Sequence, residues 1–151
     1  MQIETVNATP TGNGGKPTTT AWNGNTGPSP GNLPAGATML AATSGKVANA
    51  VAAASLSAAA SVTTYIRKLL VSVGGATAEG TADLTITGLL GGTVVIPVYV
   101  PANANQVNTF SIDFDVGGWP ASAVNTAIAA SLAALGAGNV SASVSVMGYR
   151  I

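Results

Sequence analysis

Apolar and polar side chains alternate along most of the chain after residue 38, and a period of two predicts β-strands. The segments that carry this pattern are 63–73, 81–89, 92–101, 108–116, 123–135 and 139–149. Glycine-rich breaks at 74–75, 91–92 and 136–138 follow or separate several of them. Short strands at such regular spacing predict an all-β fold, an antiparallel β-sandwich of seven or eight strands with a jelly-roll-like arrangement.

Segment 108–116 shows the alternation clearly and indicates which face should be buried. Phe110, Ile112, Phe114 and Val116 lie on one face, and Ser111, Asp113 and Asp115 lie on the other. We expect the first face to belong to the core, so that Ile112→Ala lowers the free energy of unfolding by about 2–5 kcal/mol. Removal of the Asp113 carboxylate should have a much smaller effect, because a solvated charge contributes little to stability.

Two features restrict the strand prediction or leave it open. Pro97 lies within segment 92–101, and proline has no N–H to donate to a ladder, so it predicts an edge strand or a bulge. The alanine-rich segment 46–62 has good helix propensity. However, it lacks the large apolar residues at helical spacing that would dock a helix. We therefore favour a strand near 47–56, followed by a loop near 57–62, over a helix.

Residues 1–37 are rich in glycine, proline, asparagine and threonine, and they hold too few apolar groups to offset the entropy cost of ordering. We expect an extended N-terminal arm here, followed by a sandwich domain at 38–151 that folds without it. Trp22, Leu33 and Met39 are the candidate partner-binding residues, with Trp22 entering a pocket on a neighbouring molecule. The alternative is that Trp22 folds back onto its own domain. If the arm binds the partner, its deletion should abolish that binding.

The chain of 151 residues carries very little charge for its length. Charged residues make up 7% of it, with five basic and five acidic side chains and a formal net charge of zero. In an average protein about 25% of the residues are charged. Such a surface gives weak colloidal protection to a free monomer and suits a protein that packs against copies of itself or a partner. We expect no nucleic-acid partner, because the sequence offers no basic patch, and no membrane partner, because the uncharged stretches are rich in small polar residues or interrupted by proline.

Residues that support catalysis or cofactor binding are scarce. The chain has no histidine and no cysteine, which removes the usual general base and the thiolate ligands. Asp113 and Asp115 share a strand face and could hold a hard cation such as Ca²⁺, but an ion pair with Arg67 or Lys68 is the interpretation we favour. We expect no enzyme activity, no cofactor, no catalytic residue and no metal site.

Four segments resemble a group of small structural proteins of tailed bacteriophages. They read "SGKVANAVAAASL" (44–56), "TTYIRKL" (63–69), "TITGLLGGT" (85–93) and "PASAVNTAIAASLAALGAGNVSASVSVMGY" (120–149). The resemblance spans residues 44–149, about two thirds of the chain, and its motifs are turn and strand patterns. The run Ser57–Val62 departs from it, since a glycine-containing turn is expected there, and the arm lies outside it.

This resemblance implies a virion component of the capsid decoration, cement or head-fibre type. Such a protein would be made in the host cytoplasm, would lie on the capsid surface, and would bind the major capsid protein and further copies of itself, with a trimer as the expected form. The alternative is a tail-fibre, tail-tip or receptor-binding module. That alternative predicts an exposed aromatic or polar cleft near Tyr65, Tyr99, Trp119 or Tyr149.

Overall fold

The computed structural model describes residues 33–115 and 117–151, and all of their regular elements are strands. The strands are β1 (Thr38–Thr43), β2 (Ala52–Leu56), β3 (Thr64–Gly74), β4 (Gly80–Leu89), β5 (Gly92–Val100), β6 (Val107–Asp113), β7 (Trp119–Pro120), β8 (Ile128–Leu132) and β9 (Ala142–Arg150). No membrane-spanning helix occurs among the described residues. The predicted all-β class is confirmed.

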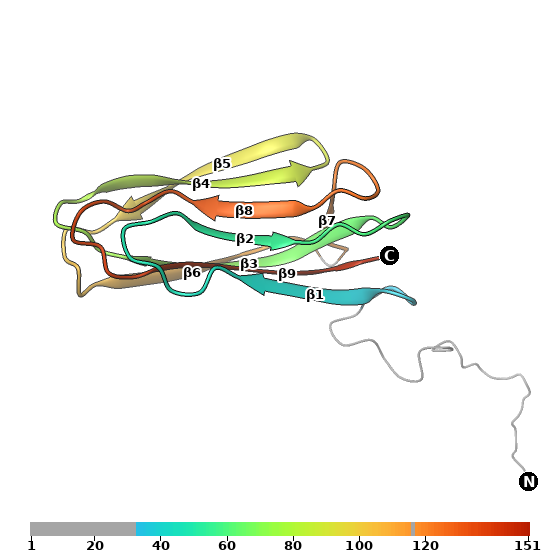
Figure 1. The fold of residues 1–151 in the computed structure, drawn as a ribbon, viewed down its shortest axis with the longest axis horizontal. Coiled ribbons are helices and arrows are strands. Elements are labelled where there is room, and N and C mark those ends of the chain that lie inside the picture. Colours follow the sequence, from blue (N-terminus) through green and yellow to red (C-terminus); the bar gives the residue numbers. More distant parts are fainter. Residues whose placement is uncertain (1–32, 116) are drawn as a thin grey trace, which may run out of the picture. The chain divides into compact units, whose positions relative to one another are not determined.

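The strands form two antiparallel sheets that pack face to face (Figure 1). One sheet has the order β1-β9-β3-β6, with the two-residue β7 also paired to β3, and the other has the order β2-β8-β4-β5. Leaving β7 aside, the first strand pairs with the last, the second with the second last, and so inward to the hairpin β4–β5. This nesting of four antiparallel pairs over two sheets is the jelly-roll arrangement.

The segment 46–62 forms a strand, as we favoured, but a shorter one. β2 begins at Ala52, and Val47 makes only an isolated bridge to Ala142. The preceding residues bend because Asn49 adopts a positive φ of 44° and its side-chain oxygen accepts a hydrogen bond from the Gly136 N–H. Residues 57–63 form the expected loop.

The other predicted strands differ from the observed ones at their ends. Segment 123–135 is a strand only at β8, and segment 139–149 begins its strand three residues later, at Ala142. In the second case the side chain of buried Asn139 donates hydrogen bonds to the carbonyl oxygens of Gly74, Gly75 and Ser141. These bonds hold residues 139–141 outside the regular strand pairing. Strands β1 and β7 were not predicted as individual elements.

The core is the single layer of side chains between the two sheets. Its largest fully buried members are Leu56, Ile66, Leu69, Leu84, Ile86, Leu89, Ile128 and Leu132, with valines from β3, β5 and β9. The alternation predicted for β4 is confirmed, because Ala82, Leu84 and Ile86 are buried. Gly148 lets β9 approach β3 closely, since a Cβ at this position would collide with the carbonyl oxygen of Tyr65.

The two long sides of the sandwich differ in how well the core is covered. On one side, β2 packs against both β1 and β9 of the facing sheet. On the other side, the main contacts of β5 are with β4 and those of β6 are with β3, so the two edge strands face each other across an open seam. Pro97 lies in β5 at this edge, as predicted.

The same seam corrects the prediction for β6. Phe110, Ile112 and Phe114 do face the core, but they are half-buried side chains at its margin, because β6 has a strand on one flank only. Val116 lies outside the described residues. The cost of removing Ile112 should therefore fall below the range expected for a fully buried isoleucine.

Ile86 offers a matched comparison, because it is the same residue type and is fully buried in β4. We predict that Ile86→Ala lowers the free energy of unfolding by about 2–5 kcal/mol, and that Ile112→Ala lowers it by about half as much. Urea denaturation of the two variants beside the parent chain measures both values. Equal losses would contradict the open seam, because they would mean that Ile112 is as well covered as Ile86.

Candidate functional site

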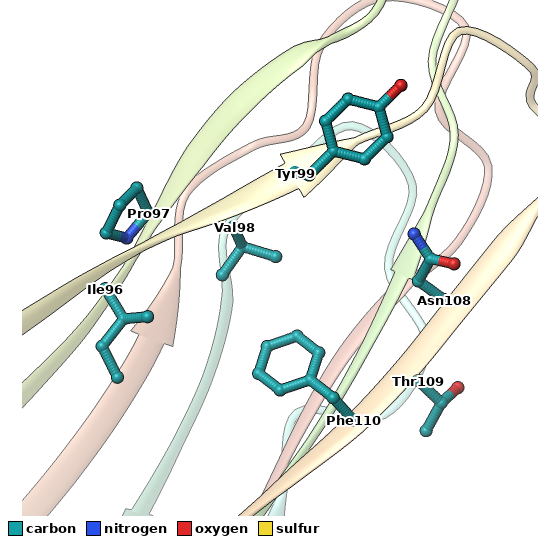
Figure 2. Close-up of a pocket in the computed structure, with 7 residues that line it drawn as sticks. All are labelled: Ile96, Pro97, Val98, Tyr99, Asn108, Thr109 and Phe110. Carbon is teal, nitrogen blue, oxygen red and sulfur yellow. The ribbon is translucent and has the colours of Figure 1, made fainter.

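The seam between the edge strands contains a groove of about 440 Å³. It is lined by Ile96, Pro97, Val98 and Tyr99 of β5 and by Asn108, Thr109 and Phe110 of β6. Figure 2 shows Ile96, Val98 and Phe110 pointing into the space between the strands, and Asn108 extending toward the side of Tyr99. We call this hollow the edge groove. Its floor is apolar, and its polar groups lie at one end.

Tyr99 is the exposed aromatic group of the edge groove, with 53% of its surface accessible. Its hydroxyl donates a hydrogen bond of 3.1 Å to Oε2 of Glu79. This hydrogen bond, together with the negative charge of Glu79, raises the pKa of the Tyr99 phenol. The carboxylate therefore orients the ring at the rim of the groove.

The second notable surface is the outer face of the sheet β2-β8-β4-β5. Its solvent-facing residues are Ala53, Ser55, Ala129, Ser131, Thr81, Asp83, Thr85, Thr87, Thr93, Val95, Pro97 and Tyr99. Eleven of these twelve side chains are uncharged, and most of them are small. Such a face can approach another surface closely with little loss of charge hydration.

Asp113, one of the two carboxylates considered as a cation site, forms an ion pair. Lys68 Nζ lies 2.8 Å from Oδ1 of Asp113 across the β3–β6 pairing. The hydrogen bond from Lys68 lowers the pKa of Asp113 below its usual value. Within the described residues, no group of three or more acidic or other metal-ligating side chains comes together. This arrangement agrees with the ion-pair interpretation.

The three residues predicted to bind a partner fall in different places. Trp22 lies outside the described residues. Leu33 is half-buried and precedes β1. Met39 is not part of an arm, because it lies within β1, pairs with Tyr149 and is 56% exposed on the edge of the sheet. Met39 therefore belongs to the sandwich and not to the arm, and its role in partner binding stays a prediction.

The aromatic residues named for a receptor-binding cleft do not gather in one site. Tyr65 and Tyr149 stack with their ring centroids 4.8 Å apart, and the Tyr149 hydroxyl donates to the Gly117 carbonyl at 2.5 Å. Trp119 donates from Nε1 to the Leu90 carbonyl and contacts Phe114 edge-on. Tyr99 alone of these four lines the edge groove.

Sequence reasoning missed the edge groove as a site. Pro97 and Tyr99 mark β5 as an edge strand with an outward aromatic group, but β6 is equally necessary to the groove. The two strands belong to different sheets, and no local pattern shows that their edges face each other.

The buried Tyr149 predicts how stability depends on pH. Burial, and to a lesser extent the proximity of Tyr65, raises the pKa of its phenol, while Arg67 opposes the shift. Because the pKa is higher in the folded state than in the unfolded state, the folded protein binds this proton more tightly. The free energy of unfolding therefore keeps its full value below about pH 10 and falls as the pH rises through the folded-state pKa. Urea denaturation at a series of pH values from 9 to 11.5 should show this fall in the free energy of unfolding. The Tyr149→Phe variant should show a smaller fall over the same range.

Tyr99→Phe is the control, because Tyr99 is an exposed tyrosine whose pKa is also raised. Its removal should leave most of the alkaline loss in place. A parent chain with constant stability across this range would contradict the predicted role of Tyr149.

Comparison with known proteins finds no match among family models, curated proteins or solved structures.

Proposed function

We propose that the protein is a structural component of a tailed-phage virion that decorates and stabilises the capsid by binding the lattice of the major capsid protein. The observation that carries this proposal is the nearly uncharged outer face of the sheet β2-β8-β4-β5. The resemblance of segments within 44–149 to small phage structural proteins supports it. The jelly-roll arrangement supports it as an analogy, because this fold also builds viral capsid domains.

The composition favours a non-enzymatic role. Enzymes depend on groups whose pKa values lie near the working pH, and histidine is the most frequent of them. This chain has neither histidine nor cysteine, and its titratable side chains amount to a few acids, bases and tyrosines. A neutral module of this kind is suited to occupy one position on the capsid surface after synthesis in the host cytoplasm.

The size of the outer face suggests why the protein would act as an oligomer. Four strands at about 4.8 Å spacing and about six residues of 3.4 Å each cover roughly 400 Å². A stable protein–protein interface buries about 800 Å² on each partner. One copy would therefore bind a shell weakly through this face, whereas several linked copies bind with much higher avidity. A homotrimer at a local three-fold position fulfils this requirement.

A tail-fibre or receptor-binding module is the second candidate function. The observation that favours it is the exposed Tyr99 ring beside Asn108 in the edge groove. Copy number separates the two functions, because a capsid lattice offers many equivalent positions and a tail offers few. Quantitative mass spectrometry of purified virions should find hundreds of copies if the protein decorates the capsid. A dozen copies or fewer would overturn decoration in favour of a tail location.

A charge placed on the outer face tests which surface meets the shell. Thr87 is an exposed residue on this face, next to Ala129 of β8. We predict that Thr87→Glu weakens binding to capsids assembled without this protein by at least tenfold, because the new carboxylate must lose its hydration on contact. Sedimentation of capsids with bound protein measures the effect.

The matched control is Ala41→Glu, which adds the same charge to the exposed β1 strand of the opposite sheet. This variant should bind capsids as tightly as the parent chain. If Ala41→Glu were the more damaging change, the sheet containing β1 would be the contact surface.

A further inference from the structure

The edge groove is a stretch of core that the sandwich itself leaves uncovered. Ile96 and Phe110 lie half-buried at its floor and pack against fully buried core residues. On the opposite side of the sandwich, β1 and β2 contact each other and cover the core. Apolar side chains that are half covered gain further stabilisation when another apolar group fills the space above them.

The strand β5 restricts what can fill the groove. An added strand that pairs along β5 needs a regular row of N–H and C=O groups, and Pro97 provides no N–H at the middle of this edge. Edge-to-edge pairing of two β5 strands is interrupted for the same reason. An occupant must therefore be held mainly by a side chain that enters the groove.

The segment 17–32 of this chain has the right chemistry for that occupant. It contains no charged residue, and it contains Trp22, the only aromatic residue ahead of the sandwich. None of the residues that line the groove is charged, and the nearby Glu79 is engaged by the Tyr99 hydroxyl. An uncharged segment with one large aromatic side chain matches a neutral groove with an apolar floor, since its docking buries no unpaired charge.

The proposed assembly role favours a neighbouring copy as the source of this segment, and the sheet register sets the distance that the segment must span. The sandwich begins with Thr38 in β1, three strand positions from β6 and therefore about 14 Å away across the sheet. Thr38 pairs with Arg150, whereas Phe110 lies beside Val71, which pairs with Val144, about 20 Å further along β9. Thr38 thus lies at one corner of the sandwich, and the groove lies at the diagonally opposite corner.

Contacts between opposite corners of successive copies are head-to-tail contacts, which close into rings when the rotation permits. Trp22 precedes Thr38 by 16 residues, which span up to about 50 Å when extended. This length exceeds the distance from Thr38 to the groove, so the segment can reach the groove of a neighbouring copy as well as its own. We propose that Trp22 of one copy inserts into the edge groove of the next copy and links the copies into a closed ring.

The inference rests on the proposed assembly role and deepens it, because it names the contact that would join the copies. Its test uses the free protein without capsids, so the two proposals can fail separately. A ring that forms in solution but does not bind capsids would refute decoration alone. Capsid binding without the Trp22 contact would refute this inference alone.

The absence of cysteine from the chain allows a direct cross-linking test. One full-length variant carries Asn23→Cys, next to Trp22, and a second carries Asn108→Cys in the edge groove. We expect the mixed variants to form an intermolecular disulfide at least tenfold faster than a mixture of Asn23→Cys with Thr93→Cys. Thr93 is an exposed control position near the far end of β5.

Trp22→Ala in the Asn23→Cys chain should reduce the rate to that of the control, and Trp22→Phe should restore part of it. Equal rates with Asn108→Cys and Thr93→Cys would overturn the proposal. A chain that carries both Asn23→Cys and Asn108→Cys and forms only an intrachain disulfide would overturn it as well, because the arm would then dock on its own sandwich.

Discussion

Burial of one shared layer of side chains between two sheets is the interaction on which the rest of this structure depends. The inner residues of β1 and β2 include three alanines, Ala42, Ala52 and Ala54, beside Leu40 and Leu56, and the two sheets contact each other there. Near the other side of the sandwich the inner residues include Ile96 and Phe110, and the sheets have few contacts there. The edge groove lies on the side where β5 and β6 leave the margin of this layer uncovered.

The sequence predicts much of the local structure, because a period of two is visible without knowledge of strand pairing. The buried face of β4, the exposed charge of Asp113 in β6 and the edge position of β5 all follow from single segments. The strand predicted within segment 46–62 is confirmed despite the helix propensity of its alanines, because alanines without large apolar neighbours cannot dock a helix on a core.

The pairing of strands that lie far apart in the sequence could not be predicted from such local patterns. Strands β8 and β9 follow each other in the chain but lie in opposite sheets, and β1 is completed by β9 about a hundred residues away. The burial of Phe110 and Ile112 was overestimated because a strand pattern shows which face is apolar but not whether a neighbouring strand covers it. The groove, which needs the edges of two sheets, could not be predicted from either strand.

The fold shows where the low charge of the chain leaves uncharged surfaces. The outer face of one sheet is nearly uncharged, and the groove along the seam has an apolar floor without charged groups. Both surfaces would favour association over long-lived free monomers, since little charge hydration opposes their burial. This is the behaviour that the proposed role on a symmetric lattice requires.

The central claim is that assembly of the copies covers the open seam between β5 and β6. Hydrogen exchange of the full-length protein at increasing concentration tests it most directly. The account predicts that exchange slows in the segment around Asn108, Thr109 and Phe110 as copies associate, while the β1 edge around Ala41 keeps its rate. Exchange around Phe110 that does not change with concentration while the protein associates would contradict the account, because the copies would then meet through another surface.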